Sequence, residues 1–174
     1  MSTLEVKELS HPTGEVLKIA TGKTLDLKSQ GTTTLPTGSV LQVVQGVLTQ
    51  LGGGFVTSST SYVNTGITAT ITPSSTSSKI LITISSNYDT EAAGRQPAWT
   101  IYRGSAQLSS ASGFGSGYSQ GSRLITDLAI TFLDTPTTTS ATTYTLYGKT
   151  FDTAAVEFNT QGITSTIVLQ EIAG

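Results

Sequence analysis

The chain has 174 residues and a formal net charge of −2, and only 11% of its residues are charged, against about 25% in typical soluble domains. This balance argues against nucleic-acid binding, because such proteins carry basic patches that neutralise phosphate. The chain has no cysteine, which excludes disulfides and thiolate metal sites. Ser and Thr make up close to a third of the residues, and β-branched Thr favours strands.

No segment of the sequence is expected to enter or cross a membrane. No stretch approaches the roughly 20 consecutive apolar residues of a spanning helix, and residues 1–7 contain no apolar run of signal-peptide length. We therefore expect a protein that is made in a cytoplasm without a secretion signal.

The first predicted elements are three short stretches that begin with Thr-Gly and then place apolar side chains at alternate positions. They cover residues 13–19, 21–27 and 37–43. The glycine suits a turn, and the alternation predicts a short, half-buried strand. Such a small unit needs a neighbouring strand, either from another repeat or from another subunit. The side chains expected to face this shared core are Leu17, Ile19, Leu25 and Leu27.

The distribution of charge divides the chain into two parts. Residues 1–28 hold eight of the twenty charged residues, whereas residues 29–78 hold none. The turn-rich segment at residues 29–36 separates these compositions. We therefore predict an arm at residues 1–36 that anchors the chain and assembles with other copies, followed by a body at residues 37–174.

The body is predicted to be all-β, because β-branched and alternating runs recur between Ser, Thr, Gly and Pro residues. The expected strands cover residues 40–48, 67–71, 79–85, 97–103, 124–133, 143–149, 156–158 and 166–172, with a hairpin joining 55–56 to 62–63. The last strand is expected inside a sheet. This pattern indicates an antiparallel β-sandwich of jelly-roll-like architecture, preceded by the arm of short strand repeats.

Two long loops are expected between these strands. Residues 89–96 form a polar loop, and residues 104–121 form a Gly- and Ser-rich loop that contains Phe114 and Tyr118. A loop as long as the second one is usually functional or disordered when it occurs in a compact domain.

The acidic residues offer two candidate pairs for glycoside hydrolysis, which needs two carboxylates about 5–10 Å apart. One pair is Asp127 and Asp134, and the other is Asp89 and Glu91. Solvated or turn-forming carboxylates explain both pairs better. The single histidine, His11, lies in the arm and would have to contact the body to serve a catalytic triad. We therefore expect no enzyme activity.

Metal and cofactor sites also lack suitable ligands. With one histidine, no cysteine and no acidic cluster expected, we predict no metal site. The Gly-rich stretch at residues 113–117 lacks the Lys-Ser/Thr pair of a phosphate-binding loop. We therefore predict that the protein carries no cofactor.

Glycan or receptor binding without catalysis fits the composition better. Aromatic faces can cover the apolar side of a sugar ring, and loops on a rigid sandwich are common binding sites. The candidates for receptor contact are Tyr88, Phe114 and Tyr118. For Phe114 and Tyr118, packing against an adjacent subunit is an equal alternative. Trp99 and Tyr102 lie in a predicted strand and are expected in the core.

Five segments of the body share a pattern with a known family. They are residues 36–44, 57–81, 99–104, 133–144 and 167–172. In these segments the chain resembles a domain common in structural proteins of tailed bacteriophages, especially phages of marine and freshwater bacteria. The resemblance implies a virion protein, typically a trimeric tail fibre or fibre-like domain, and it supplies no catalytic residues.

These observations together predict a phage virion structural protein that acts by assembly. The expected form is a homotrimeric short tail fibre or fibre-tip domain, which trimerises through neutral, apolar faces. Its arm would attach to another virion protein, such as a tail or baseplate adaptor, and its body would contact the host surface. The alternative is a capsid decoration or cement protein, or a head fibre, with the capsid as partner.

Overall fold

The computed structural model describes residues 21–22, 35–49 and 53–174. The chain divides into two units, Met1–Thr34 and Leu35–Gly174. In the first unit the described residues, Thr21 and Gly22, form a turn in which Gly22 has a φ of 76°. The predicted core residues of the arm lie outside the described residues; they are Leu17, Ile19, Leu25 and Leu27.

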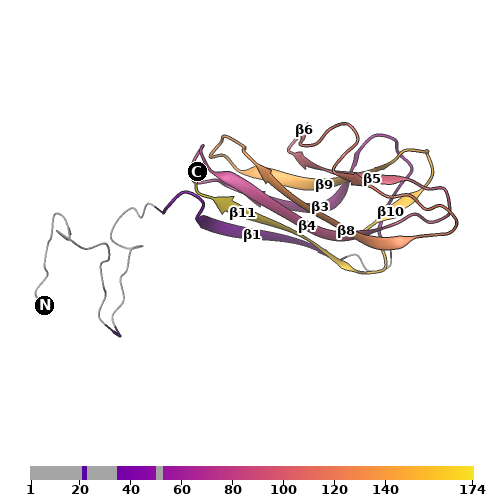
Figure 1. Cartoon of the computed structure of the whole chain (residues 1–174), viewed down its shortest axis with the longest axis horizontal. Coiled ribbons are helices and arrows are strands. Elements are labelled where there is room, and N and C mark those ends of the chain that lie inside the picture. Colours follow the sequence, from indigo (N-terminus) through magenta and orange to yellow (C-terminus); the bar gives the residue numbers. More distant parts are fainter. Residues whose placement is uncertain (1–20, 23–34, 50–52) are drawn as a thin grey trace, which may run out of the picture. The chain divides into compact units, whose positions relative to one another are not determined.

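The described residues of the second unit form eleven strands (Figure 1). In chain order they are β1 (Val40–Thr49), β2 (Phe55–Thr57), β3 (Val63–Ile71), β4 (Lys79–Asp89), β5 (Pro97–Arg103), β6 (Ala106–Gln107), β7 (Gly115–Ser116), β8 (Ile125–Asp134), β9 (Thr142–Thr150), β10 (Val156–Phe158) and β11 (Thr164–Ile172). Within the described ranges, no helix has the length and hydropathy needed to cross a membrane.

The strands pair into two antiparallel sheets. In sheet A, β4 pairs with β8 along one edge, and it pairs with β11 and then β10 along the other edge. The strand β1 pairs with β11, and β2 pairs with β10. As predicted, the last strand lies inside a sheet, between β1 and β4.

Sheet B has the order β3-β9-β5, and the short strands β6 and β7 both pair with the remaining edge of β5. The amides of Leu108, Phe114 and Gly117 also donate to β5 carbonyls at distances of 2.8–3.0 Å. The segment predicted as a long loop at residues 104–121 therefore follows the edge of β5. These hydrogen bonds satisfy backbone groups that an open sheet edge would leave unpaired.

The predicted strands are confirmed, two of them (97–103 and 156–158) with unchanged bounds, but the predicted hairpin at residues 55–63 is wrong. The strand β2 belongs to sheet A, whereas β3 belongs to sheet B. Between them, the Ser59 amide donates to Thr57 Oγ1 at 3.1 Å, and the Ser61 amide donates to Ser59 Oγ at 3.1 Å. Local bonds of this kind stabilise turns in place of strand pairing, so this segment carries the chain from one sheet to the other.

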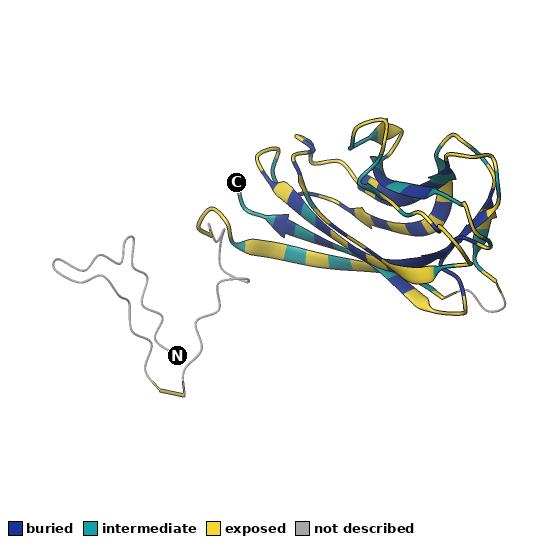
Figure 2. Ribbon diagram, turned by 45° about the vertical axis from the view of Figure 1, so that its right-hand side comes forward, coloured by how far each residue is buried: buried dark blue, intermediate teal, exposed yellow. Residues whose placement is uncertain are grey.

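The hydrophobic core lies between the inner faces of the two sheets, where Figure 2 shows buried residues alternating with exposed ones along the strands. Sheet A contributes fully buried alternate residues such as Ile80, Ile82 and Ile84 in β4. Burying one such side chain stabilises the fold by about 1.5–3 kcal/mol. The main contributions of sheet B are Ile67, Ile71, Ile101, Tyr144 and Leu146.

A buried carboxylate, that of Glu171, lies at the end of the inner face of sheet A, next to the start of β1. Glu171 in β11 is fully buried. It accepts hydrogen bonds from Gln42 Nε2 at 2.6 Å, from Ser78 Oγ at 2.6 Å, and from the amide and hydroxyl of Ser74 at 2.7 and 2.6 Å. Burial raises the pKa of Glu171, but these hydrogen bonds outweigh burial and lower the pKa to about 2.

A second buried carboxylate, Asp134 at the end of β8, joins the two sheets. It lies in the same row of sheet A as Glu171, because both residues pair with Ile80. Arg103 Nη1 of β5 donates to its two oxygens at 3.0 and 2.9 Å, and the Tyr144 hydroxyl of β9 donates at 2.7 Å. Burial and the bond to Asp134 raise the pKa of Tyr144. This group therefore connects both sheets at one end of the core.

Replacing Glu171 by Gln tests the buried carboxylate with little change in side-chain volume. Because an amide accepts fewer hydrogen bonds, we expect the free energy of unfolding to fall by about 2 kcal/mol near neutral pH. The folded pKa lies below the unfolded value of 4.5, so the stabilisation by Glu171 is present above that value and is lost as the pH falls toward about 2. Urea unfolding as a function of pH measures both effects. A stability difference between wild type and Glu171→Gln that stays constant under acid conditions would contradict the prediction.

Candidate functional site

Tyr88, one of three aromatic residues predicted to contact a receptor, lies in the core. It is 5% exposed, and its ring packs against Trp99 with the ring centroids 4.9 Å apart. The strand β4 continues to Asp89, beyond its predicted end at residue 85, and this extension places Tyr88 on the inner face. The assignment of Tyr88 to receptor contact is therefore corrected: burial, which also raises its pKa, keeps it from the surface.

Phe114 and Tyr118 lie in different environments. The Phe114 ring packs against Phe132 of β8 with centroids 4.9 Å apart, and the Phe114 amide donates to the Trp99 carbonyl at 2.8 Å. Phe114 therefore extends the core. Tyr118 is 58% exposed, so it is the one member of the predicted set with a largely free side chain.

The first candidate pair of carboxylates, Asp127 and Asp134, does not converge on a common site. Asp134 is buried on the inner face of β8, whereas Asp127 is exposed on the outer face. Seven residues of extended chain place them about 23 Å apart along the strand. This distance exceeds the range required for glycoside hydrolysis.

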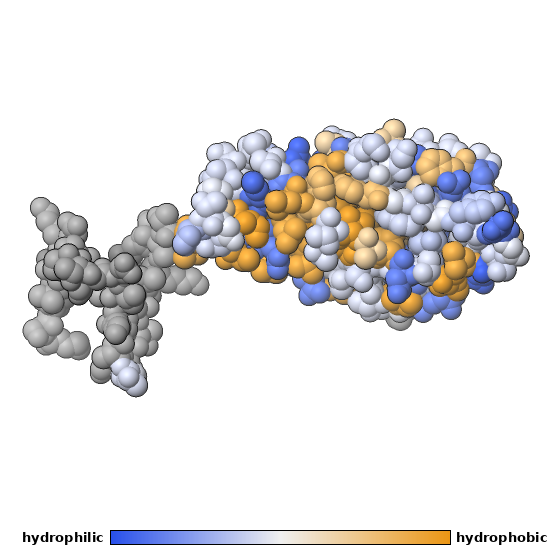
Figure 3. Space-filling view, in the orientation of Figure 1, coloured by the Kyte–Doolittle hydropathy of each residue, from blue (hydrophilic) through white to orange (hydrophobic). Residues whose placement is uncertain are grey.

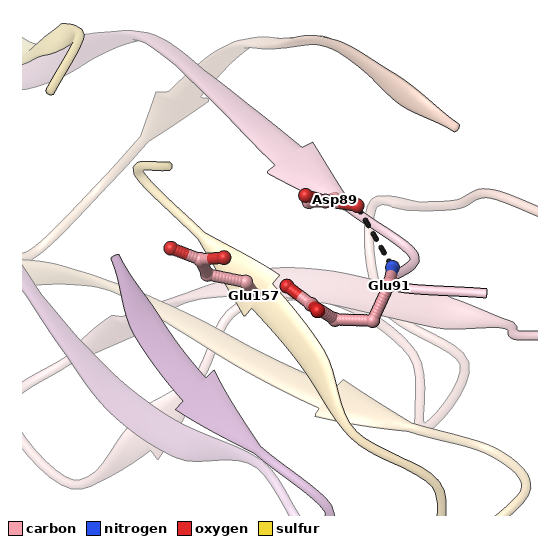
Figure 4. A group of neighbouring side chains, drawn as sticks. All are labelled: Asp89, Glu91 and Glu157. Carbon is pink, nitrogen blue, oxygen red and sulfur yellow. Dashed lines mark hydrogen bonds between the residues drawn. The ribbon is translucent and has the colours of Figure 1, made fainter. Parts of the chain in front are cut away.

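The second candidate pair, Asp89 and Glu91, meets Glu157 of β10 in an acidic cluster (Figure 4). Carboxylate oxygens of the three residues lie within 4.8 Å of one another. Asp89 and Glu157 are directly paired on β4 and β10, and the Glu91 amide donates to Asp89 Oδ1 at 2.8 Å. The sequence did not predict the contribution of Glu157, because strand pairing brings it to this position from a distant part of the chain.

Neighbouring donors compensate the negative charge of the acidic cluster. Arg123 Nε donates to both oxygens of Asp89, at 2.9 and 2.8 Å, and Arg123 Nη2 bonds to the same carboxylate. Burial raises the pKa of Asp89, but the bonds from Arg123 outweigh burial and lower it. The Gly54 amide donates to Glu157. A hydrogen bond with Glu157 is the main cause of a raised pKa at Glu91.

The bonds within the acidic cluster hold strand ends together. Asp89 is fully buried and is already paired with Arg123, so its carboxylate cannot reach a substrate as a nucleophile or an acid. A cation in this place would have to compete with the guanidinium. With Arg123, the acidic cluster joins β4, β10 and the segment before β8.

The central part of the outer face of sheet A carries no charged side chain, although Lys79 and Asp127 lie further along the same face. The strand registers place its side chains in rows that cross β1, β11, β4 and β8. The first row is Val43, Gln170, Leu81 and Leu133; the second is Gln45, Val168, Thr83 and Thr131; the third is Val47, Thr166, Ser85 and Ala129. None of these twelve residues is charged. Figure 3 shows apolar atoms over the part of the body where these strands run.

The exposed apolar side chains of this face are suited to contact with another protein surface. Val43 and Val47 are 57% and 59% exposed, and Leu133 is 48% exposed. Large contiguous apolar surfaces are uncommon on monomers, and the centres of subunit interfaces are depleted of charge. The rows could not be assembled from sequence alone, because they depend on the register between distant strands.

The two loop aromatics should respond differently to truncation. We expect Phe114→Ala to lower the free energy of unfolding by about 2 kcal/mol, because it removes a ring packed on the core. Tyr118→Ala should change it by less than about 0.5 kcal/mol, because the side chain is mostly exposed. Urea unfolding of both variants measures the difference, and equal losses of stability would contradict this assignment.

Comparison with known proteins gives no indication of function. The chain matches no protein-family model and no curated protein. Two features suggest contacts with other molecules: the uncharged central part of the outer face of sheet A and the exposed ring of Tyr118.

Proposed function

We propose that the chain is a structural protein of a phage virion, a homotrimeric short tail fibre or fibre-tip domain. The observation that carries this proposal is the uncharged central part of the outer face of sheet A with its exposed Val43, Val47 and Leu133. In the trimer this face lies between subunits. Complete burial of a half-exposed Val or Leu contributes about 1 kcal/mol, so several such side chains on each subunit favour stable association.

We also propose that the body is a jelly roll, which supports a virion role. Eight strands remain when β2 and β10 are left out and β6 and β7 are counted as one interrupted strand. Sheet A then has the order β1-β11-β4-β8, and sheet B has the order β3-β9-β5 followed by the interrupted strand β6/β7. When the eight strands are renumbered from 1 to 8 along the chain, these orders become 1-8-3-6 and 2-7-4-5. Jelly rolls pair two sheets in this way and are frequent in viral capsid and lectin domains. Because one fold serves many functions, the assembly face carries more weight.

In the proposed particle, residues 1–36 anchor the trimer to another virion protein, such as a tail or baseplate adaptor. The strand β1 follows this arm and contributes Val43 and Val47 to the assembly face. The body then contacts the host surface, with Tyr118 as a candidate contact. This division leaves one outer face of the sandwich for assembly and other surfaces for the host.

A lysine in the proposed interface should dissociate the trimer. We expect Leu133→Lys to weaken self-association at least 100-fold, because it places a charge where an apolar side chain is buried. Thr70→Lys is the matched control, since Thr70 is an exposed residue of β3 in sheet B. Size-exclusion chromatography with light scattering gives the mass, and thermal unfolding verifies that both variants fold. A wild-type protein that is a folded monomer at micromolar concentration would rule out the trimer.

Host contact through Tyr118 makes a separate prediction. Phage particles that carry Tyr118→Ala should adsorb to host cells several-fold more slowly, while the mass of the purified protein stays unchanged. Ile163→Ala is the control, because Ile163 is exposed in another turn. If particles lacking the protein adsorbed normally but lost their resistance to heat, the protein would be assigned to capsid decoration.

A further inference from the structure

The outer face of sheet B carries three tyrosines in contact, Tyr62, Tyr102 and Tyr147, which we call the tyrosine strip. The rings of Tyr102 and Tyr147 stack with centroids 4.1 Å apart, and the Tyr62 ring meets Tyr102 edge-on at 6.4 Å. Tyr147 points outward because the adjacent Leu146 is fully buried on the inner face. Tyr102 lies on the same side, opposite Thr145. The sequence-based placement of Tyr102 in the core is therefore wrong.

Neutral hydrogen-bonding groups flank the tyrosine strip. The Tyr102 hydroxyl donates to Gln107 Oε1 at 3.3 Å. Further along the same face, the exposed hydroxyls of Thr70 and Thr143 lie 2.7 Å apart. Aromatic rings beside amides and hydroxyls provide both kinds of contact that a sugar ring needs: apolar contact for its C–H face and hydrogen bonds for its hydroxyls.

A cation, Lys149, lies at the Tyr62 end of the tyrosine strip. Its Nζ is 4.4 Å from the centroid of the Tyr62 ring and 4.6 Å from that of Phe151, and it donates to the Ala111 carbonyl at 3.2 Å. Contacts of this kind hold an ammonium group over aromatic rings. The side chain therefore has a defined position next to the strip.

Lys149 gives this face a positive charge that no strand of sheet B neutralises. Apart from Lys149, the described strands of this sheet contain one charged residue, Arg103, which is bonded to Asp134 of sheet A. The nearby loop carboxylate, Asp152, bonds to the Thr150 hydroxyl and lies 3.9 Å from Arg95. An anionic group on a ligand would therefore meet Lys149 without an adjacent strand carboxylate repelling it.

The backbone around Gly113 keeps Tyr62 in place. A Cβ at this glycine would collide with the Tyr62 hydroxyl and with the Trp99 carbonyl. The Tyr62 hydroxyl is buried and has no hydrogen-bond partner among the described residues, so Tyr62 offers its ring and not its hydroxyl to a ligand. A surface held in this way loses little conformational freedom on binding.

We propose that the tyrosine strip and Lys149 bind a glycan that contains acidic sugars. In the proposed complex, a sugar ring packs on the accessible part of the half-buried tyrosine rings, and its carboxylate lies near the Lys149 ammonium. This inference rests on the proposed role in host contact, for which it names the surface and the ligand class. Because the strip lies on sheet B, association through the outer face of sheet A leaves it free.

Titration calorimetry on the full chain with trigalacturonic acid and maltotriose tests the site with matched acidic and neutral probes. We expect the acidic probe to bind about tenfold more tightly. Lys149→Gln should remove that preference and leave the weaker binding, whereas Tyr147→Ala should weaken the binding of both probes. Lys79→Gln is the charge-matched control, because Lys79 is exposed on β4 of sheet A.

Several outcomes would overturn the inference: no binding of either probe at millimolar concentration, equal affinity for both probes, or an equal effect of Lys79→Gln. Tyr147→Phe should retain binding because it keeps the ring, so it remains informative if Tyr147→Ala fails to fold. Light scattering on the same samples separates this inference from the proposed function. A trimer that binds neither probe overturns only the glycan site, whereas a monomer that binds the acidic probe overturns the trimer.

Discussion

The body depends on the contact between the inner faces of two antiparallel sheets. In an extended strand successive side chains point to opposite sides, so residues buried in this contact determine which residues remain outside. In β4, Ile80, Ile82 and Ile84 are buried, and Leu81 and Thr83 between them face outward. The alternation of side chains along each strand therefore determines both the core and the two outer surfaces of the sandwich.

Buried carboxylates with hydrogen-bond donors lie at the two ends of the sandwich. Glu171 receives donors from β1 and from the turn before β4, and Asp134 receives donors from two strands of sheet B. Asp89 is compensated by Arg123 at the other end of β4. An unpaired buried carboxylate is strongly destabilising, so a displaced strand would lose these bonds as well as apolar contact. The carboxylates thereby favour one register among the strands.

The two outer faces of the sandwich differ in chemistry, and each of the two proposed contacts rests on one of them. Sheet A presents rows of Val, Leu and Thr, with Val43 and Leu133 in the same row. Sheet B presents stacked tyrosines beside a single ammonium group, Lys149. The first surface is suited to a copy of itself, and the second to a polar ligand with a negative charge.

The sequence by itself determined the all-β class and the positions of most strands, because alternation and β-branched residues are local signals. It did not determine which strands pair, and for this reason the predicted hairpin before β3 was wrong. It also did not determine where β4 ends or which face of β5 is buried. Tyr88 was therefore predicted at the surface but lies in the core, and Tyr102 was predicted in the core but points outward. Only the tertiary structure brought Glu157 to Asp89 and placed Val43 and Leu133 in one row. These neighbours are distant in the chain, and a shift of one residue in register would turn each side chain to the opposite face.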